Sequence, residues 1–137
     1  MVDSRYIIID TREKRPWSFK SQLHKALKHG DYSIYQGTTK IVIERKSLID
    51  LVGTLSGQRY LKFFAKMQRA TQALPRVYLF IEANLTELYH EVPHSSLPTH
   101  ILINRLLNLM EIGVQVIFTG GGKKGAIFAE SLLRKLG

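Results

Sequence analysis

Cysteine is absent from the 137 residues of this chain. A disulfide framework and a metal site built on thiolates are therefore excluded. No apolar run approaches the ~18 residues that a membrane-spanning helix needs, and the first residues lack the apolar core of a secretory signal. These absences predict no membrane-spanning segment, and they are compatible with a protein of the reducing interior of the cell.

Acidic residues are also scarce, because 11 Asp and Glu stand against 20 Lys and Arg, for a formal net charge of +9. Such an excess is typical of proteins that bind nucleic acid, although a surface charged only for solubility has the same composition. With 45% hydrophobic residues, the chain is long enough to form a real core. It shows no linker, internal repeat or low-complexity tract, so we expect one domain over residues 1–137.

Two runs rich in β-branched and aromatic residues, 31–36 and 39–46, predict a β-hairpin. The Gly-Thr pair between them suits a two-residue type II′ turn. In the register that this turn sets, Asp31 falls opposite Glu44. The two carboxylates lie far from the turn, at the open end of the hairpin, where a cleft can form.

The opposed acids predict a metal site. Directly opposed residues have Cβ atoms roughly 4.5–5.5 Å apart, so Asp31 and Glu44 would repel each other unless a hard cation such as Mg²⁺ lay between them, with Mn²⁺ as a substitute. Lys46 shares the strand face of Glu44 and could orient a water or stabilise the charge on a phosphate. Asp10 ends another apolar strand and is a candidate third ligand or orienting group. The alternative is that these acids are ordinary solvated carboxylates in surface ion pairs.

Gly30-Asp31, a spacer, Glu44-Arg45-Lys46, three residues and Asp50 resemble the signature GDX(n)ERKX(3)D. That signature belongs to the XPF/MUS nucleases, a branch of the PD-(D/E)XK nuclease superfamily. Further resemblances to this family come from the D-x-R-E sequence after the first strand and from two later positions. The residues concerned are Asp10, Arg12 and Glu13, then Arg59 and Glu82.

This resemblance implies a restriction-endonuclease-like α/β fold, in which helices flank a central mixed sheet. It also implies a Mg²⁺-dependent endodeoxyribonuclease that cuts branched DNA, such as forks or flaps, in repair or recombination and leaves a 5′-phosphate and a 3′-hydroxyl. Arg45, which alternates away from Glu44, would anchor the sheet or help to form the site. The tandem helix-hairpin-helix and helicase regions of the family have no room in these residues. Two other functions remain open, namely an inactive DNA-binding scaffold and a Holliday-junction resolvase.

The pattern of apolar residues, turn residues and helix caps predicts alternating strands and helices. We expect strands at 5–10, 32–36, 39–46, 76–82 and 114–118. We expect helices at 21–28, 47–55, 59–72, 85–90, 99–112 and 125–136, with a loop at 93–98. Strands interleaved with helices indicate an α/β domain with one hairpin in a largely parallel sheet.

Basic residues beside these motifs are candidates for contact with the DNA backbone. Some line the polar face of the helix at 59–72, and others lie in the glycine-rich loop at 119–125, where free amides and lysines attract phosphate. That loop does not match a nucleotide-binding P-loop, which needs glycine at position 117 and Ser or Thr at 124. A solvated helix face and a flexible turn are the alternatives. The candidates are Arg12, Arg59, Lys62, Lys66, Arg69, Lys123 and Lys124.

Several residues have two possible roles. Asp50 either belongs to the site or only stabilises the start of its helix, and Trp17 either covers the core or stacks on a base. The helices at 99–112 and 125–136 carry apolar side chains that either complete the core or form a homodimer or heterodimer interface. The histidines predict no site and are interpreted as surface or packing residues; they are His24, His29, His90, His94 and His100.

Overall fold

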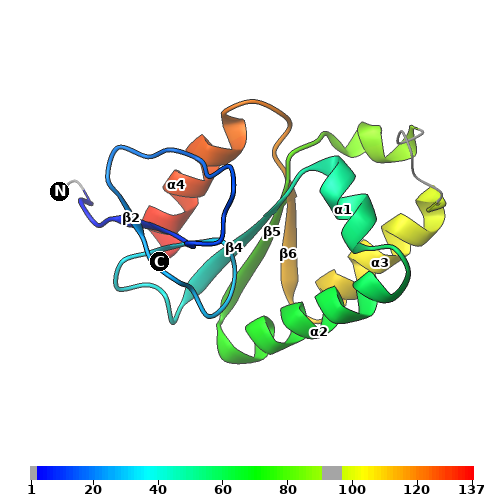
Figure 1. Ribbon diagram of the computed structural model, residues 1–137, viewed down its shortest axis with the longest axis horizontal. Coiled ribbons are helices and arrows are strands. Elements are labelled where there is room, and N and C mark those ends of the chain that lie inside the picture. The colour runs from blue at the N-terminus through cyan, green and yellow to red at the C-terminus, as the bar shows by residue number, and fades with distance from the viewer. Residues whose placement is uncertain (1–2, 91–96) are drawn as a thin grey trace.

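The computed structural model describes residues 3–90 and 97–137. The predicted loop at 93–98 falls mostly outside these ranges, as does His94. In the described residues the chain folds in the order β1 (Ile7–Ile9), β2 (Gln22–His24), β3 (Tyr32–Ile34), β4 (Ile41–Lys46), α1 (Leu48–Thr54), α2 (Gly57–Ala73), β5 (Arg76–Ile81), the 3₁₀ helix η1 (Leu85–Tyr89), α3 (Thr99–Glu111), β6 (Val114–Phe118) and α4 (Lys124–Leu136) (Figure 1).

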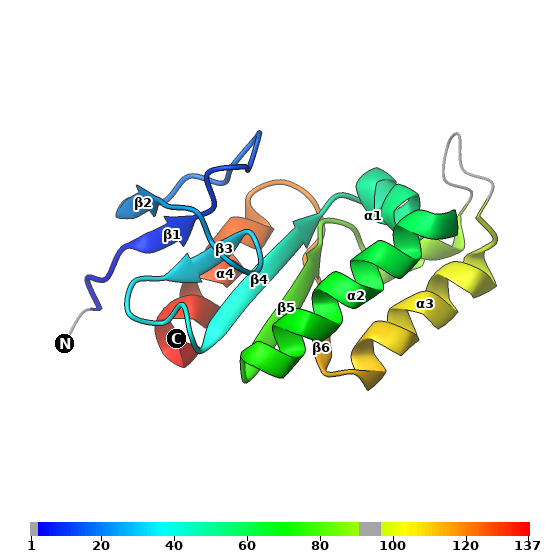
Figure 2. The ribbon, with the colours of Figure 1, turned by 60° about the horizontal axis from the view of Figure 1, so that its bottom comes forward.

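The strands form one mixed sheet in the order β2-β1-β3-β4-β5-β6. Strands β4, β5 and β6 are parallel, whereas β3 is antiparallel to both of its neighbours. Helices α1, α2 and α3 lie on one side of the sheet and α4 lies on the other, and α2 and α3 run side by side (Figure 2). The predicted α/β class, with helices flanking a mixed sheet, is confirmed.

Each face of the sheet has its own hydrophobic core, because successive side chains of a strand point to opposite faces. From β4 and β5, one set packs against α1, α2 and α3, and the alternate set packs against α4. The first set is Val42, Val77, Leu79 and Ile81, and the second is Ile41, Ile43, Tyr78 and Phe80. Burial on both faces explains why residues 76–81 are almost continuously apolar.

Trp17 belongs to the core on the α4 side, where only 7% of its surface is exposed. Its ring stacks on that of Tyr32, with centroids 4.5 Å apart. It also packs edge-on against Phe19, at a centroid distance of 6.4 Å. Trp17 therefore covers the core, as one of the two predicted roles requires, and does not offer a free face to a nucleic acid base.

The β3–β4 hairpin has the predicted register but a different turn. Tyr32 pairs with Ile43, which is the pairing that sets Asp31 opposite Glu44. The predicted type II′ turn is wrong, because the connection runs over residues 35–40 and the left-handed residue is Gln36, with φ 67°. Gly37 is required by close packing instead, since a Cβ there would lie 2.6 Å from Ile34 Cγ2. The predicted register is therefore present without the two-residue turn from which it was predicted.

The helix predicted at 21–28 is wrong. Residues Gln22–His24 form the edge strand β2, which pairs in parallel with β1. The Ile7 amide donates to the Ser21 carbonyl at 2.9 Å, and the Lys25 amide donates to the Ile9 carbonyl at 3.0 Å. Pairing with the otherwise open edge of β1 satisfies these backbone groups, and this non-local gain outweighs the local helix propensity of the segment.

The remaining predicted elements are confirmed, with boundaries that differ by a few residues at most. The segment at 85–90 is a 3₁₀ helix, not a regular α-helix. Ser47 caps α1 as predicted, because its hydroxyl accepts a hydrogen bond from the Asp50 amide at 3.1 Å. No helix within the described ranges is both long and apolar enough to cross a bilayer.

Gly30 sets the position of Asp31. Its φ of +75° lies in the left-handed region, and a Cβ at this position would lie 2.8 Å from Val42 Cβ. This close approach lets the Asp31 amide donate to the Ile43 carbonyl at 2.8 Å. The glycine of the Gly-Asp motif is therefore a backbone requirement of the hairpin.

We predict that Gly30→Ala lowers the free energy of unfolding by about 3 kcal/mol, because left-handed strain and overpacking each cost about 1–3 kcal/mol. Urea unfolding followed by circular dichroism measures the change. Gly121→Ala is the matched control, because a Cβ there meets nothing within 4 Å, and its effect should stay within about 0.5 kcal/mol. Equal midpoints for both variants would contradict the role assigned to Gly30.

Candidate active site

The last three residues of β4 point alternately to the two faces of the sheet. Lys46 points toward α2, and its ammonium lies 5.6 Å from the centroid of the Phe63 ring. Glu44, two residues earlier, shares that face. Arg45 points to the opposite face, where its guanidinium carbon lies 4.6 Å from the centroid of the Trp17 ring. The predicted separation of Arg45 from Glu44 and Lys46 is therefore confirmed.

Asp31 directly precedes β3 and Glu44 lies in the neighbouring strand β4, as the hairpin register requires. Asp31 Oδ2 accepts a hydrogen bond from the Arg45 amide at 2.8 Å. Glu44 is only 3% exposed, and burial together with the charge of Asp31 raises the pKa of Glu44 to about 7, against the opposing pull of Lys66 and Lys46. Asp31 is thus close enough for its charge to disfavour ionisation of Glu44.

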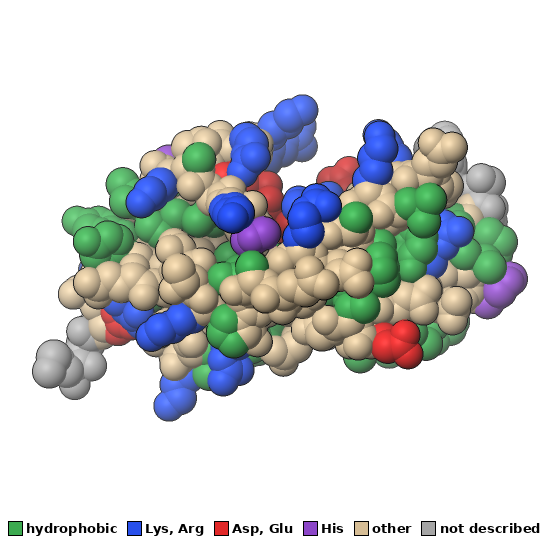
Figure 3. Space-filling model, turned by 90° about the horizontal axis from the view of Figure 1, so that it is seen from below, with side chains coloured by type: hydrophobic (Ala, Val, Ile, Leu, Met, Phe, Trp, Pro, Cys, Tyr) green, Lys and Arg blue, Asp and Glu red, His purple; other side chains and the backbone are tan. Residues whose placement is uncertain are grey.

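A cleft of about 680 Å³ opens where β4 and β5 end. It brings together most of the residues singled out by the sequence motifs. Figure 3 shows acidic side chains in a hollow that has Lys and Arg side chains on both sides. The lining residues are Arg12, Glu13, Lys14, Arg15, Asp31, Glu44, Arg45, Lys46, Ser47, Asp50 and Glu82.

Asp10 does not line this cleft, and its carboxylate is held by other groups. It accepts hydrogen bonds from the Arg12 side chain at 2.9 and 3.0 Å and from the Leu27 amide at 2.8 Å. Burial alone would raise the pKa of Asp10, but these hydrogen bonds outweigh it and hold the pKa below its usual value. Of the two predicted roles for Asp10, this geometry favours the orienting one, since the carboxylate fixes the Arg12 guanidinium.

Arg45 is held on the far face by a cage of acceptors. Its Nε donates to Glu82 Oε1 at 2.7 Å, and one Nη donates to the Arg15 carbonyl at 2.7 Å. The Trp17 indole N–H approaches the second Glu82 oxygen at 3.4 Å. Glu82 therefore orients Arg45, and this ion pair links the ends of β4 and β5.

The Tyr32 hydroxyl completes the cage. It accepts hydrogen bonds from the Trp17 amide at 2.9 Å and from Arg45 at 3.2 Å, and it donates to Glu13 at 2.9 Å. Burial and the charge of nearby Asp31 raise the pKa of Glu13. The sequence predicted no role for Tyr32 in a site, and for Trp17 it predicted only a cover of the core or a stacking partner for a base. Their aromatic rings fit a core equally well, and only the fold reveals their polar contacts.

A second hollow of about 610 Å³ adjoins the first and shares Lys46 and Asp50 with it. Its other charged residues come from the predicted basic face of α2. Sequence periodicity identified this face but not its direction, and so it missed that Lys66 reaches Glu44, with Nζ 3.1 Å from Oε1. The charged lining residues are Lys46, Asp50, Arg59, Lys62 and Lys66.

Lys123 and Lys124 lie apart from both hollows, at the start of α4. Lys124 lines a separate and mainly apolar groove. Asp50 does both things that were predicted as alternatives, because it stands in the first turn of α1 and also lines the acidic cleft.

Asp31 and Glu44 fit a hard divalent cation. Glu44 Oε1 is buried and accepts no hydrogen bond of normal geometry from the described residues, so it has lone pairs to offer a metal ion. Residues 3–90 and 97–137 contain no group of three or more His, Cys, Asp or Glu side chains placed to hold a metal. Water or substrate oxygens would therefore supply the other ligands, as is usual for Mg²⁺.

The fold is shared with two solved structures. XPF from Aeropyrum pernix superposes with a TM-score of 0.75 and 23% identity, covering 95% of this chain and 64% of that chain. XPF from Aeropyrum pernix in complex with DNA superposes with a TM-score of 0.75 and 20% identity, covering 96% of this chain and 64% of that chain. The protein therefore has the restriction-endonuclease-like α/β fold of the XPF nuclease domain.

The sequence comparison then identifies the family. Residues 9–131 match the family model described as the ERCC4 domain, and the chain belongs to the ERCC4 domain family. This confirms the family resemblance inferred from the motifs. No curated protein sequence matches the chain at a significant level. The chain spans 64% of the length of the two solved structures.

We predict that Tyr32→Phe lowers the free energy of unfolding by about 1–3 kcal/mol, because the buried Trp17 amide loses its acceptor. Chemical denaturation with fluorescence detection measures this change. Tyr35→Phe is the control, since Tyr35 is 50% exposed, and it should be neutral. A neutral Tyr32→Phe would show that the hydroxyl does not hold the cage.

Proposed function

We propose that this chain is a metal-dependent endodeoxyribonuclease domain that hydrolyses phosphodiester bonds in branched DNA, such as forks and flaps, during repair or recombination. The observation that carries the proposal is the pairing of Asp31 with a buried Glu44 in a cleft with cationic sides. Membership of the ERCC4 domain family supports it, as does the same fold in an XPF bound to DNA. A DNA substrate places the activity with the DNA, inside the cell.

Asp31 and Glu44 would hold the metal ion, Mg²⁺ or Mn²⁺ in its place. Such an ion lowers the pKa of bound water and neutralises charge on a phosphate oxygen. Lys46, on the face that Glu44 also occupies, orients the attacking water or donates to a phosphate oxygen. Water attacking in line with the leaving oxygen cuts one strand, and the family implies a 5′-phosphate and a 3′-hydroxyl as products.

The cationic sides of the two hollows bind the DNA backbone. The side chain of Arg12 is 71% exposed although it pairs with Asp10, so it can reach a phosphate while its direction stays fixed. Arg59 and Lys62 line the adjoining hollow. These contacts neutralise phosphates without reading base sequence. Lys123 and Lys124 at the start of α4 provide a further contact outside the cleft.

We predict that Asp31→Ala and Glu44→Ala each reduce cleavage by about a thousandfold or more, because several kcal/mol of metal-derived stabilisation are lost. DNA affinity should be kept, since neither acid attracts phosphate. The measurement is single-turnover cleavage of labelled fork, flap, four-way junction, duplex and single-stranded DNA, with and without Mg²⁺. Fluorescence anisotropy gives the affinity in parallel.

Glu111→Ala, at the exposed end of α3, is the matched control and should cleave like the unmodified protein. Wild-type nicking by both acid variants would refute the assignment. Cleavage of no substrate by the unmodified protein would favour a DNA-binding scaffold instead. Symmetric paired nicks confined to the four-way junction would favour a resolvase.

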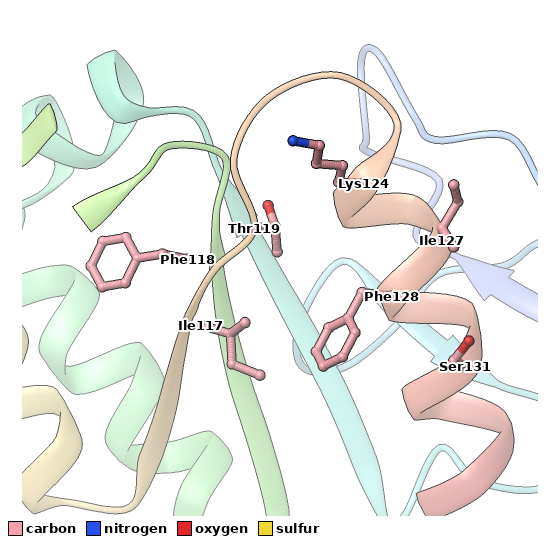
Figure 4. A pocket seen from close by; sticks show the side chains of 7 residues that line it. All are labelled: Ile117, Phe118, Thr119, Lys124, Ile127, Phe128 and Ser131. Atoms are coloured by element: carbon pink, nitrogen blue, oxygen red, sulfur yellow. The ribbon is translucent and has the colours of Figure 1, made fainter. Parts of the chain in front are cut away.

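We further propose that a second copy of this chain packs against an apolar groove between β6 and α4. The groove has a volume of about 450 Å³, and Figure 4 shows the side chains of Ile117, Phe118 and Phe128 around it. Ile127 is 67% exposed, and β6 is an edge strand of the sheet. Exposed apolar surface on a chain of this size is typical of an interface with another chain.

We predict that Ile127→Asp converts a dimer into a monomer, because a carboxylate would be buried at the interface without a partner. Sedimentation velocity over a range of protein concentrations measures the assembly. Leu61→Asp is the control, since Leu61 is 65% exposed on α2, and this variant should remain a dimer. A monomeric unmodified protein at every concentration would refute a homodimer.

A further inference from the structure

Glu44 has one ionic partner within the described part of the chain, and it comes from a helix outside the sheet. Lys66 Nζ lies 3.1 Å from Glu44 Oε1 and 3.2 Å from Oε2. The Glu44 side chain is 3% exposed, whereas that of Lys66 is 44% exposed. The ammonium therefore reaches from the protein surface to a carboxylate that water barely contacts.

The Lys66 ammonium and a metal ion can each compensate the negative charge of Glu44. A buried carboxylate is costly unless a cation compensates its charge, and Lys66 supplies that charge when no metal is bound. Yet Nζ lies near both oxygens without giving Oε1 a hydrogen bond of normal geometry. Both Glu44 oxygens thus lie within reach of one ammonium, so a divalent ion that binds the same carboxylate is repelled by Nζ for as long as Nζ stays there.

We propose that Lys66 is a tethered cation that competes with the divalent metal ion for Glu44 and is released toward the phosphate backbone when the metal binds. This inference rests on the metal site of the proposed function. It adds that metal-free and metal-bound proteins differ in which positive charge Glu44 holds.

The hollow beside α2 has room for the released ammonium. Lys66 already lines the hollow that contains Arg59, Lys62 and Lys46, and its exposed side chain can turn into that space. Metal binding therefore adds one cation to the surface that binds phosphate. Because linkage is reciprocal, phosphate that draws Lys66 away from Glu44 also strengthens metal binding.

The test is a titration of metal-free, ¹⁵N-labelled protein with Mg²⁺ at pH 8.5, followed through backbone amide shifts at Asp31 and Glu44. We expect Lys66→Met to bind Mg²⁺ roughly tenfold more tightly than the unmodified protein, because the competing cation is gone. Lys66→Arg keeps a cation on the helix and should stay within about threefold of the unmodified protein.

Lys40→Met is the matched control for the change in net charge. Lys40 is exposed and directly precedes β4, about 13 Å along the strand from Glu44. The Lys40→Met variant should therefore bind Mg²⁺ with the affinity of the unmodified protein. Folding of each variant is checked by its amide spectrum, and if Lys66→Met does not fold, Lys66→Gln replaces it with the same expectation.

Each result has a distinct meaning. Equal or weaker Mg²⁺ binding by Lys66→Met would overturn the competition while leaving the metal site intact. Tighter binding by Lys40→Met as well would also overturn it, because net charge would then account for the gain. Absence of binding by every variant would remove the metal site of the proposed function, and the competition with it.

Discussion

Two like charges held side by side are the constraint on which the rest of the site depends. The β3–β4 pairing places Asp31 beside Glu44, and burial of Glu44 at 3% exposure prevents water from screening the repulsion. Two surrounding groups compensate the negative charge, each from a different direction. Lys66 approaches from α2, and the Arg45 amide donates to Asp31 through the backbone. Cationic side chains therefore surround the two acids at the cleft.

The strand β4 presents residues with different roles on the two faces of the sheet. On the α2 side it presents Glu44 and Lys46, the residues assigned to chemistry. On the α4 side it presents Arg45, which Glu82, Tyr32 and the Arg15 carbonyl hold in place. Adjacent residues of one three-residue motif, Glu44-Arg45-Lys46, thus serve both faces of the sheet.

The sequence allowed the site to be predicted where local chemistry dominates and failed where distant contacts decide. The β-branched composition of the two strands identified the hairpin, and the pairing of Asp31 with Glu44 is correct although the two-residue turn from which it was predicted is wrong. The strand at Gln22–His24 was mistaken for a helix, because its partner β1 lies more than ten residues away and no local pattern signals that pairing. Lys66 was seen only as part of a basic helix face, since the direction of α2 depends on how it packs on the sheet. For Asp10 the sequence left two roles open, a third ligand or an orienting group, and the hydrogen bonds from Arg12 favour the second.

Trp17 is the chain's single tryptophan, and its ring contacts both the Tyr32 ring and the Arg45 guanidinium. Arg45 also forms part of the wall of the acidic cleft. All of the tryptophan emission therefore originates from one indole, one side chain removed from the cleft. The fluorescence of Trp17 can therefore report changes around Arg45 at the wall of the cleft without any added label.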